Sequence, residues 1–237
     1  MSLNGSYYLV TGGQGGIGKG IASLLKEQGV NVIVTTSRKE AADSSQDIFY
    51  WDMLQEESTK SLISDLKEKK YDISGFVHCA HIFSAPQLLL QLKSNELMDS
   101  VTQNFKEAFN LSKYLLKKMS RKNHGVVLFL GSLISQKPHT GKATYIIEKN
   151  MLCGLIKAIH GDFYKKGIRA SVLHPGLVAT KQIMDGMSSE VLSEVGLEEL
   201  LTVDEVSLKA IEIINLAYQG KDQHVISYEL AGGQKWW

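Results

Sequence analysis

The sequence predicts an α/β fold in a single domain, with a seven-stranded parallel sheet and helices on both faces. Short apolar runs alternate with longer segments of helical period along the whole chain, as in successive βαβ units. A glycine-rich turn follows the first apolar run. The chain has 237 residues, three prolines and no linker-like or low-complexity stretch. We therefore expect residues 1–237 to form one unit.

Each element is predicted from its own local pattern. Apolar runs rich in β-branched residues predict strands at residues 7–10, 30–35, 48–51, 76–79, 126–130, 168–173 and 224–227. Apolar residues spaced three and four apart predict helices at residues 17–28, 56–69, 96–119, 145–165 and 203–217. Residues 181–199 form the least periodic long stretch, which predicts a lid over an active site.

The composition excludes several classes of function. Lysines and arginines number 26 and acidic residues 25, so no strong field favours nucleic acid or an anionic membrane. The two cysteines, Cys79 and Cys153, are too few for a disulfide framework. No apolar run approaches the roughly 20 residues of a membrane helix, and no signal peptide is evident. We expect a cytoplasmic protein that uses neither nucleic acid nor membrane as a partner.

The turn after the first predicted strand suits a phosphate group. It reads Thr11-Gly12-Gly13-Gln14-Gly15-Gly16-Ile17-Gly18. Glycines let the backbone approach a pyrophosphate, and the helix that follows points its amino end at the phosphates. A tight turn without a ligand is the alternative. The spacing of Gly12, Gly16 and Gly18 resembles that of the short-chain dehydrogenase/reductase family.

This resemblance implies a Rossmann fold and a nicotinamide dinucleotide cofactor. The residues of the turn that it assigns to cofactor binding are Thr11, Gly12, Gln14, Gly16, Ile17 and Gly18. It covers nearly the whole chain, as far as the Ala231-Gly232-Gly233 segment.

Tyr145 and Lys149 lie four residues apart at the start of a predicted helix and share a face. A nearby ammonium lowers the pKa of a tyrosine, which then exchanges a proton more readily. Ser132 follows the strand at 126–130, so it lies at the crevice where ligands of parallel sheets bind. A chance Tyr-x-x-x-Lys pair is the alternative.

The resemblance assigns the catalytic roles. It implies that Ser132 positions the substrate oxygen, that Tyr145 is the general acid and base, and that Lys149 binds the nicotinamide ribose and lowers the tyrosine pKa. Asn104 is the single amide on an apolar helical face, and a buried amide requires a hydrogen-bond partner. The resemblance makes Asn104 the fourth catalytic residue, which helps hold a water in a proton relay; a structural bond to nearby backbone is the alternative.

Further cofactor contacts follow from the same resemblance. The His174-to-Thr180 segment is similar to the family's Pro-Gly-x-x-x-Thr segment, which contacts the nicotinamide carboxamide. The contacts expected there are Pro175, Gly176, Val178 and Thr180, with Asp52, Met53 and Ala80 near the adenosine and Tyr145 and Lys149 at the nicotinamide ribose. An ordinary turn and a solvated acidic residue are the competing interpretations.

The end of the second strand predicts the choice of cofactor. An acidic side chain there binds the ribose hydroxyl of NAD, and a basic one accommodates the phosphate of NADP. Thr36 occupies the acidic position, and Ser37, Arg38 and Lys39 follow it. We therefore predict NADP(H), with NAD(H) as the less favoured cofactor; the alternative is that Arg38 and Lys39 only face solvent.

Two segments depart from the family pattern. Where the family usually has Asn-Asn-Ala-Gly, this chain has His78-Cys79-Ala80-His81. The spacing of these residues is too tight for a usual zinc site, so we predict no metal. The residues before Lys149 are Ile146, Ile147 and Glu148, where the family more often has small side chains.

Within the family the chain looks most like the 3-oxoacyl-[acyl-carrier-protein] reductase group. The function predicted is NADPH-dependent reduction of a ketone, for example a 3-oxoacyl thioester that is free or tethered to a carrier. An alcohol dehydrogenase of a small metabolite and a dinucleotide-binding sensor without turnover are the alternatives. A homotetramer or homodimer is implied, and the apolar Trp236 and Trp237 are candidates for a subunit contact.

Overall fold

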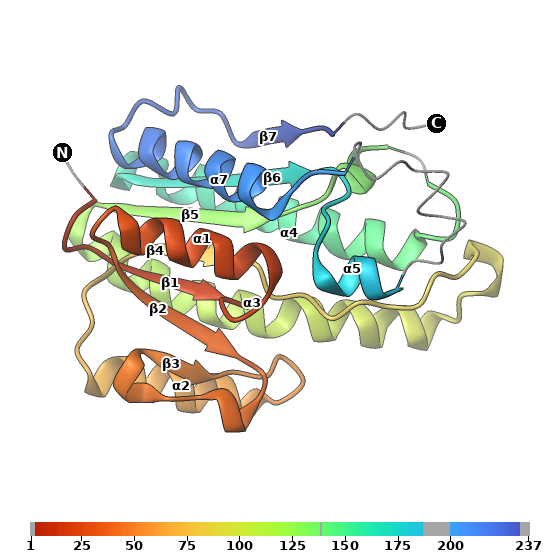
Figure 1. Cartoon of the computed structure of the whole chain (residues 1–237), viewed down its shortest axis with the longest axis horizontal. Coiled ribbons are helices and arrows are strands. Elements are labelled where there is room, and N and C mark those ends of the chain that lie inside the picture. The colour runs from red at the N-terminus through yellow and green to blue at the C-terminus, as the bar shows by residue number, and fades with distance from the viewer. Residues whose placement is uncertain (1–2, 138, 187–199, 233–237) are drawn as a thin grey trace.

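The computed structural model describes residues 3–137, 139–186 and 200–232. They form one seven-stranded sheet in the order β3-β2-β1-β4-β5-β6-β7, and every neighbouring pair runs parallel (Figure 1). The strands are β1 (Tyr7–Thr11), β2 (Asn31–Thr36), β3 (Ile48–Tyr50), β4 (Ile73–His78), β5 (Gly125–Leu130), β6 (Ile168–Pro175) and β7 (Ser227–Leu230). This is the predicted fold class.

Helices cover both faces of the sheet. They are α1 (Gly16–Glu27), α2 (Glu56–Glu68), α3 (Ser94–Lys122), α4 (Ala143–Phe163), α5 (Lys181–Gly186) and α7 (Val203–Tyr218). Short 3₁₀ helices occupy Lys39–Ala41, Ser44–Gln46, Leu89–Gln91, Leu133–Gln136 and Tyr164–Lys166. No described helix combines the length and the apolar character that crossing a bilayer requires.

Alternation along the strands divides the core into two layers. Leu9 on β1 points into one layer with residues of α2, α3 and α4. Its neighbours Tyr8 and Val10 point into the other, which α1 and α7 close. The central strands β1, β4, β5 and β6 are therefore buried on both faces, as is typical of a parallel sheet, whereas the edge strand β7 keeps two exposed residues. Figure 1 shows α1 and α7 in front of the sheet and α3 and α4 behind it.

One predicted strand is wrong in its position. We predicted the last strand at residues 224–227, but β7 begins only at Ser227. Gln223 and His224 have positive φ angles of 49° and 62°, and the Val225 amide bonds back to the Asp222 carbonyl at 2.8 Å. The apolar run therefore starts in a turn. Of the predicted lid, residues 181–186 form α5, and residues 187–199 lie outside the described residues, as do Trp236 and Trp237.

Candidate active site

A cavity of about 1500 Å³ lies at the carboxyl ends of the strands, where ligands bind in open α/β sheets. Its wall begins at the turn between β1 and α1 and extends to the start of α4 and to α5. The predicted site residues that line it are Gly12, Gln14, Gly16, Ile17, Gly18, Ser37, Arg38, Asp52, Met53, Ala80, Ser132, Tyr145, Lys149, Pro175, Gly176, Val178 and Thr180. Thr11, Lys39 and Asn104 do not line it.

Two glycines of the turn, Gly12 and Gly18, have no room for a side chain. Gly12 adopts a φ of +65°, and a Cβ there would lie 3.1 Å from the Ala80 amide nitrogen. A Cβ on Gly18 would lie 2.4 Å from the Gly12 carbonyl oxygen. Helix α1 therefore begins directly against the turn, and its first amides open toward the cavity as at known phosphate sites. The turn, with the length of the cavity beyond it, fits a dinucleotide.

Thr11 has a structural position behind this turn. Its hydroxyl lies 2.8 Å from the Nδ1 atom of His78 and accepts from the Cys79 amide at 3.2 Å and the Ala80 amide at 3.4 Å. These contacts join the ends of β1 and β4 beneath the cavity. The segment that departs from the family pattern is thus tied to the glycine turn through one buried hydroxyl.

Ser132, Tyr145 and Lys149 come together at the inner end of the cavity. Ser132 follows β5 and caps the 3₁₀ helix Leu133–Gln136, while Tyr145 and Lys149 lie one turn apart on α4. The Lys149 Nζ atom lies 5.6 Å from the centre of the Tyr145 ring and donates to the Leu130 carbonyl at 3.1 Å. The structure therefore groups the three predicted residues, and their catalytic roles stay predictions.

Burial controls the ionisation of these groups. It lowers the pKa of Lys149 to about 8, and the neighbouring Cys79 and Glu148 side chains oppose this change. Burial raises the pKa of Tyr145, a hydrogen bond with Ser132 lowers it, and the charge of Glu148 raises it. The hydrogen bond with Ser132 thus favours the phenolate and opposes the effects of burial and of Glu148.

Asn104 is buried on α3 and bonds mainly to backbone. Its side chain accepts from the Ile82 amide at 2.8 Å and donates to the Ile82 carbonyl at 2.9 Å. It also donates to the Glu148 Oε1 atom at 3.1 Å. Asn104 therefore holds the segment after β4 in place, as the structural alternative predicts, and its catalytic role stays a prediction. It shapes the cavity wall without reaching the cavity.

The other end of the cavity is more open. Ser37 and Arg38 line it after β2, and the Arg38 amide bonds to the Thr36 hydroxyl at 3.3 Å. Lys39 lies outside the lining, with its ammonium 5.2 Å from the Tyr50 ring centre. Lys39 therefore does not reach the cavity in which we expected it to contact a phosphate, because its side chain turns toward Tyr50 on β3.

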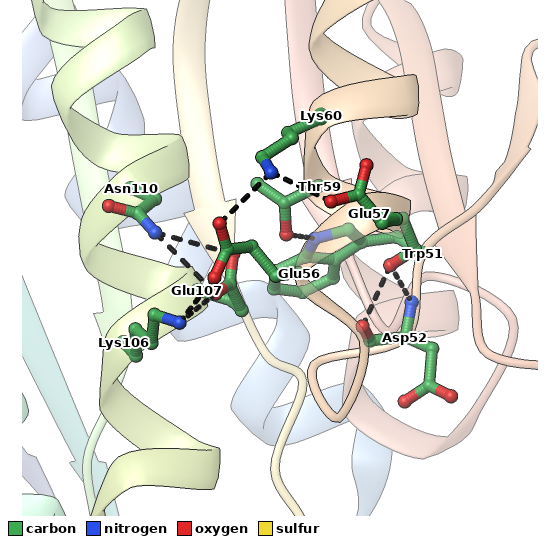
Figure 2. Close-up of polar contacts among 10 residues, drawn as sticks. Trp51, Asp52, Glu56, Glu57, Thr59, Lys60, Lys106, Glu107 and Asn110 are labelled. Atoms are coloured by element: carbon green, nitrogen blue, oxygen red, sulfur yellow. Dashed lines mark hydrogen bonds and ion pairs between the residues drawn. The ribbon is translucent and has the colours of Figure 1, made fainter.

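Asp52 and Met53 follow β3 at this open end. The Asp52 carboxylate accepts from the Leu54 amide at 2.9 Å, and the Asp52 amide and carbonyl bond to the Ser58 hydroxyl at 2.9 and 2.7 Å. Figure 2 shows the carboxylate turned away from the ion pairs that join α2 to α3. Asp52 is thus fixed by local bonds and faces the cavity.

Two residues at the site were not predicted. His81 lines the cavity beside Tyr145, and Glu148 is fully buried next to Lys149. The only sequence signal was that both occupy positions where the chain departs from the family pattern. No group of three His, Cys, Asp or Glu side chains in the described part of the chain has a geometry that would hold a metal ion.

Comparison with known proteins identifies the class. The short chain dehydrogenase family matches residues 6–190, so the chain belongs to this family of oxidoreductases. The family implies a nicotinamide dinucleotide as cofactor.

Individual relatives narrow the resemblance. The chain is 27% identical over 205 residues to the 3-oxoacyl-[acyl-carrier-protein] reductase FabG of Escherichia coli (strain K12), covering 82% of this chain and 84% of that protein. Among solved structures, a short chain dehydrogenase/reductase family protein matches with a TM-score of 0.77 and 22% identity over 97% of both chains. A ribose-5-phosphate isomerase from Brucella melitensis 16M matches with a TM-score of 0.83 and 19% identity, covering 97% of this chain and 93% of that chain. At such identities the structural likeness shows the fold alone.

Proposed function

We propose that the protein is an NADP(H)-dependent oxidoreductase that reduces a ketone, with a 3-oxoacyl thioester as the first candidate substrate and Tyr145 as the general acid and base. One observation carries the proposal. The Ser132 hydroxyl acts on the Tyr145 phenol and lowers its pKa, the Lys149 ammonium lies 5.6 Å from the Tyr145 ring centre, and all three residues line the cavity that begins at the glycine turn.

The roles follow from this arrangement. The bound dinucleotide supplies the hydride. Ser132 holds the carbonyl oxygen of the substrate, and the Tyr145 hydroxyl donates a proton to that oxygen as negative charge develops there. Lys149 holds the ribose hydroxyls of the nicotinamide and keeps a positive charge near the phenol. Asn104 keeps the segment after β4 in register with α4.

The preference for NADP(H) rests on the residues after β2. Ser37 and Arg38 line the cavity, and Thr36 offers no carboxylate that would repel a phosphate. Arg38 is exposed and carries the planar guanidinium that binds phosphate in two places. Lys39 adds positive charge at a greater distance.

The proposal of a thioester substrate is supported by the names of the relatives and by the basic side chains that line the cavity. The relatives at 27% identity are named as reductases of acyl groups on a carrier protein. His139, Lys142 and Lys181 line the cavity and would face an acidic carrier protein or a phosphopantetheine arm. We also propose a cytoplasmic homotetramer or homodimer that uses α3 and α4, since Met98 and Phe109 of α3 are exposed apolar side chains.

The test is a panel of ketones, 3-oxoacyl thioesters and small alcohols, each assayed with NADPH and with NADH. We expect oxidation of NADPH with a 3-oxoacyl thioester, and a loss of about a thousandfold or more in kcat for Tyr145→Phe. The variant should still bind NADPH, as measured by cofactor fluorescence. Cofactor binding without turnover of any substrate would contradict the proposal and indicate a sensor.

A further inference from the structure

Glu148 is an acidic side chain held inside the protein behind the catalytic end of the cavity. Its side chain has no exposed surface. Its Oε1 atom accepts from the Ser100 hydroxyl at 2.5 Å, the Asn104 amide at 3.1 Å and the Ser84 hydroxyl at 3.5 Å. These donors favour the ionised carboxyl, although burial raises the pKa of Glu148. A carboxylate therefore lies adjacent along the helix to the buried ammonium of Lys149.

His81 faces the other oxygen of this carboxyl. The His81 Nε2 and Glu148 Oε2 atoms are 3.4 Å apart, and neither has a hydrogen-bond partner among the described residues. The His81 side chain is only 4% exposed. Burial, together with the nearby Lys149 and His78, lowers the pKa of His81 to about 2, so the ring is neutral. A neutral ring meets a carboxylate by directing its Nε2–H at the oxygen.

The same ring contacts the catalytic tyrosine. The centres of the His81 and Tyr145 rings are 5.2 Å apart at 81°, an edge-to-face arrangement. Phe83 packs on both, edge-on to His81 at 4.9 Å and parallel to Tyr145 at 6.0 Å. The Tyr145 ring therefore packs against an imidazole that itself lies 3.4 Å from the Glu148 carboxyl group.

We propose that Glu148 and His81 act as a coupled positioning pair for the catalytic end. The Glu148 carboxylate orients the His81 ring, and the His81 ring fixes the plane of the Tyr145 ring. The negative charge of Glu148 also favours the protonated forms of Lys149 and Tyr145. This inference rests on the proposed function of Tyr145. It also explains the two departures from the family pattern as one feature, because the side chains at those positions meet.

The charge effect has a definite sign. A negative charge nearby raises the pKa of both Tyr145 and Lys149. Reduction of a ketone requires the protonated phenol and ammonium, so Glu148 extends activity to higher pH. The other titratable groups that face Glu148, His81 or Lys149 are His78 on β4, Cys79 after it, Cys153 on α4 and His174 on β6, whose pKa burial lowers. Burial keeps His78 neutral and raises the pKa of both thiols, so Glu148 is the carboxylate in this group.

The first experiment is the pH profile of ketone reduction by Glu148→Gln. Glutamine keeps an acceptor for Asn104 and removes the charge. We expect the alkaline limb of kcat to move to lower pH, with the KM for NADPH within about twofold. Glu107→Gln is the matched control, since Glu107 is also a buried carboxyl near a lysine but lies away from the cavity. An unmoved limb in Glu148→Gln, or an equal movement in Glu107→Gln, would overturn the charge effect.

The second experiment is a double-mutant cycle with His81→Phe, which keeps an aromatic ring against Tyr145. Each single variant leaves one partner buried without the other, and we expect each to lower kcat roughly tenfold. If the two residues are coupled, the loss in the double variant should be smaller than the product of the two single losses. Losses that simply multiply would overturn the coupling. Thermal unfolding of each variant identifies any that fail to fold.

A third readout needs no turnover, so it separates failure of this inference from failure of the proposed function. Nitrogen-detected NMR of the imidazole, assigned with His81→Phe, should show the Nε2–H tautomer in the wild-type protein and a loss of that preference in Glu148→Gln. A wild-type ring protonated on Nδ1, or a tautomer insensitive to Glu148→Gln, would contradict the pair even if the protein reduces ketones.

Discussion

The catalytic end of the cavity and the surface between α2 and α3 hold their charges in opposite ways. At the catalytic end, Lys149 and Glu148 are buried almost completely, at 4% and 2% exposure. On the surface between α2 and α3, outside the cavity, Lys106 of α3 bonds to Glu56 of α2 at 2.6 Å, and Lys60 joins them (Figure 2). About half of each of these three side chains is exposed. The 2.6 Å contact between Lys106 and Glu56 is shorter than the 3.4 Å approach of His81 to Glu148, but it lies in water, where charges interact weakly.

This contrast shows that burial, more than contact distance, decides what a charge does here. Burial lowers the pKa of Lys149 to about 8, which places its titration within reach of a working enzyme. Hydrogen bonds from Lys106 and Lys60 lower the pKa of Glu56 to about 2, far from any pH at which the protein would work. Charges at the catalytic end should therefore affect chemistry, and charges on the surface between α2 and α3 should affect little.

The largest expected effect is that of Lys149→Met. The variant loses the ammonium beside Tyr145 and its predicted bond to the ribose, so we expect kcat/KM for ketone reduction to fall by about a hundredfold or more. Steady-state kinetics with NADPH measures the loss. A variant within a factor of about three of the wild type would remove Lys149 from the mechanism.

The same variant tests the burial of the charge through the pH dependence of stability. The pKa of Lys149 is about 8 in the folded protein against an ordinary value of 10.5. Between these values the unfolded chain binds more protons, so raising the pH stabilises the wild-type protein relative to Lys149→Met. The relative gain from pH 8 to 10.5 should be on the order of 3 kcal/mol. Parallel stability curves from urea unfolding would contradict the low pKa.

An intermediate effect is expected at the end of the cavity that follows β2, where we propose that the protein discriminates NADP(H) from NAD(H). Arg38→Ala removes the exposed guanidinium that lines the cavity. We expect the preference for NADPH over NADH in kcat/KM to fall about tenfold, because one charge-assisted contact to a phosphate is lost. Turnover with NADH should stay within about twofold, which serves as the internal control. An unchanged ratio, or a wild-type protein that prefers NADH, would contradict the assignment of NADP(H).

The sequence predicted the sheet and most of the cavity because local patterns determine them. Alternating apolar runs and the glycine turn led to the correct strand number and to the correct end of the sheet. The start of β4 was missed because Gly75 interrupts its apolar run. The strand continues through Gly75 since the Tyr8 ring from β1 fills that space, with a Cβ position 2.0 Å from the ring. The sequence around Gly75 alone does not reveal that a side chain from a neighbouring strand fills the space beside it.

The pair of His81 and Glu148 was missed for the same reason. These residues are 67 positions apart in the sequence, and each alone looks like an unexplained departure from the family pattern. Only packing of α4 against the segment after β4 brings them to 3.4 Å. In contrast, Tyr145 and Lys149 share one helical turn, so their spacing was enough to predict that they lie together.

The smallest effect is expected for Lys106→Gln, which breaks the ion pair between α2 and α3 while leaving the cavity intact. The Lys106 and Glu56 side chains are exposed, so the pair is screened by water and salt. We expect a change in Tm of less than about 3 °C, lost at high salt, with unchanged kinetics. Because contacts with Lys106 and Lys60 lower the pKa of Glu56, any contribution of the pair is present above about pH 4.5 and is lost as the pH falls toward 2. A large or salt-insensitive change in Tm would show that contact distance outweighs exposure at this end of the molecule.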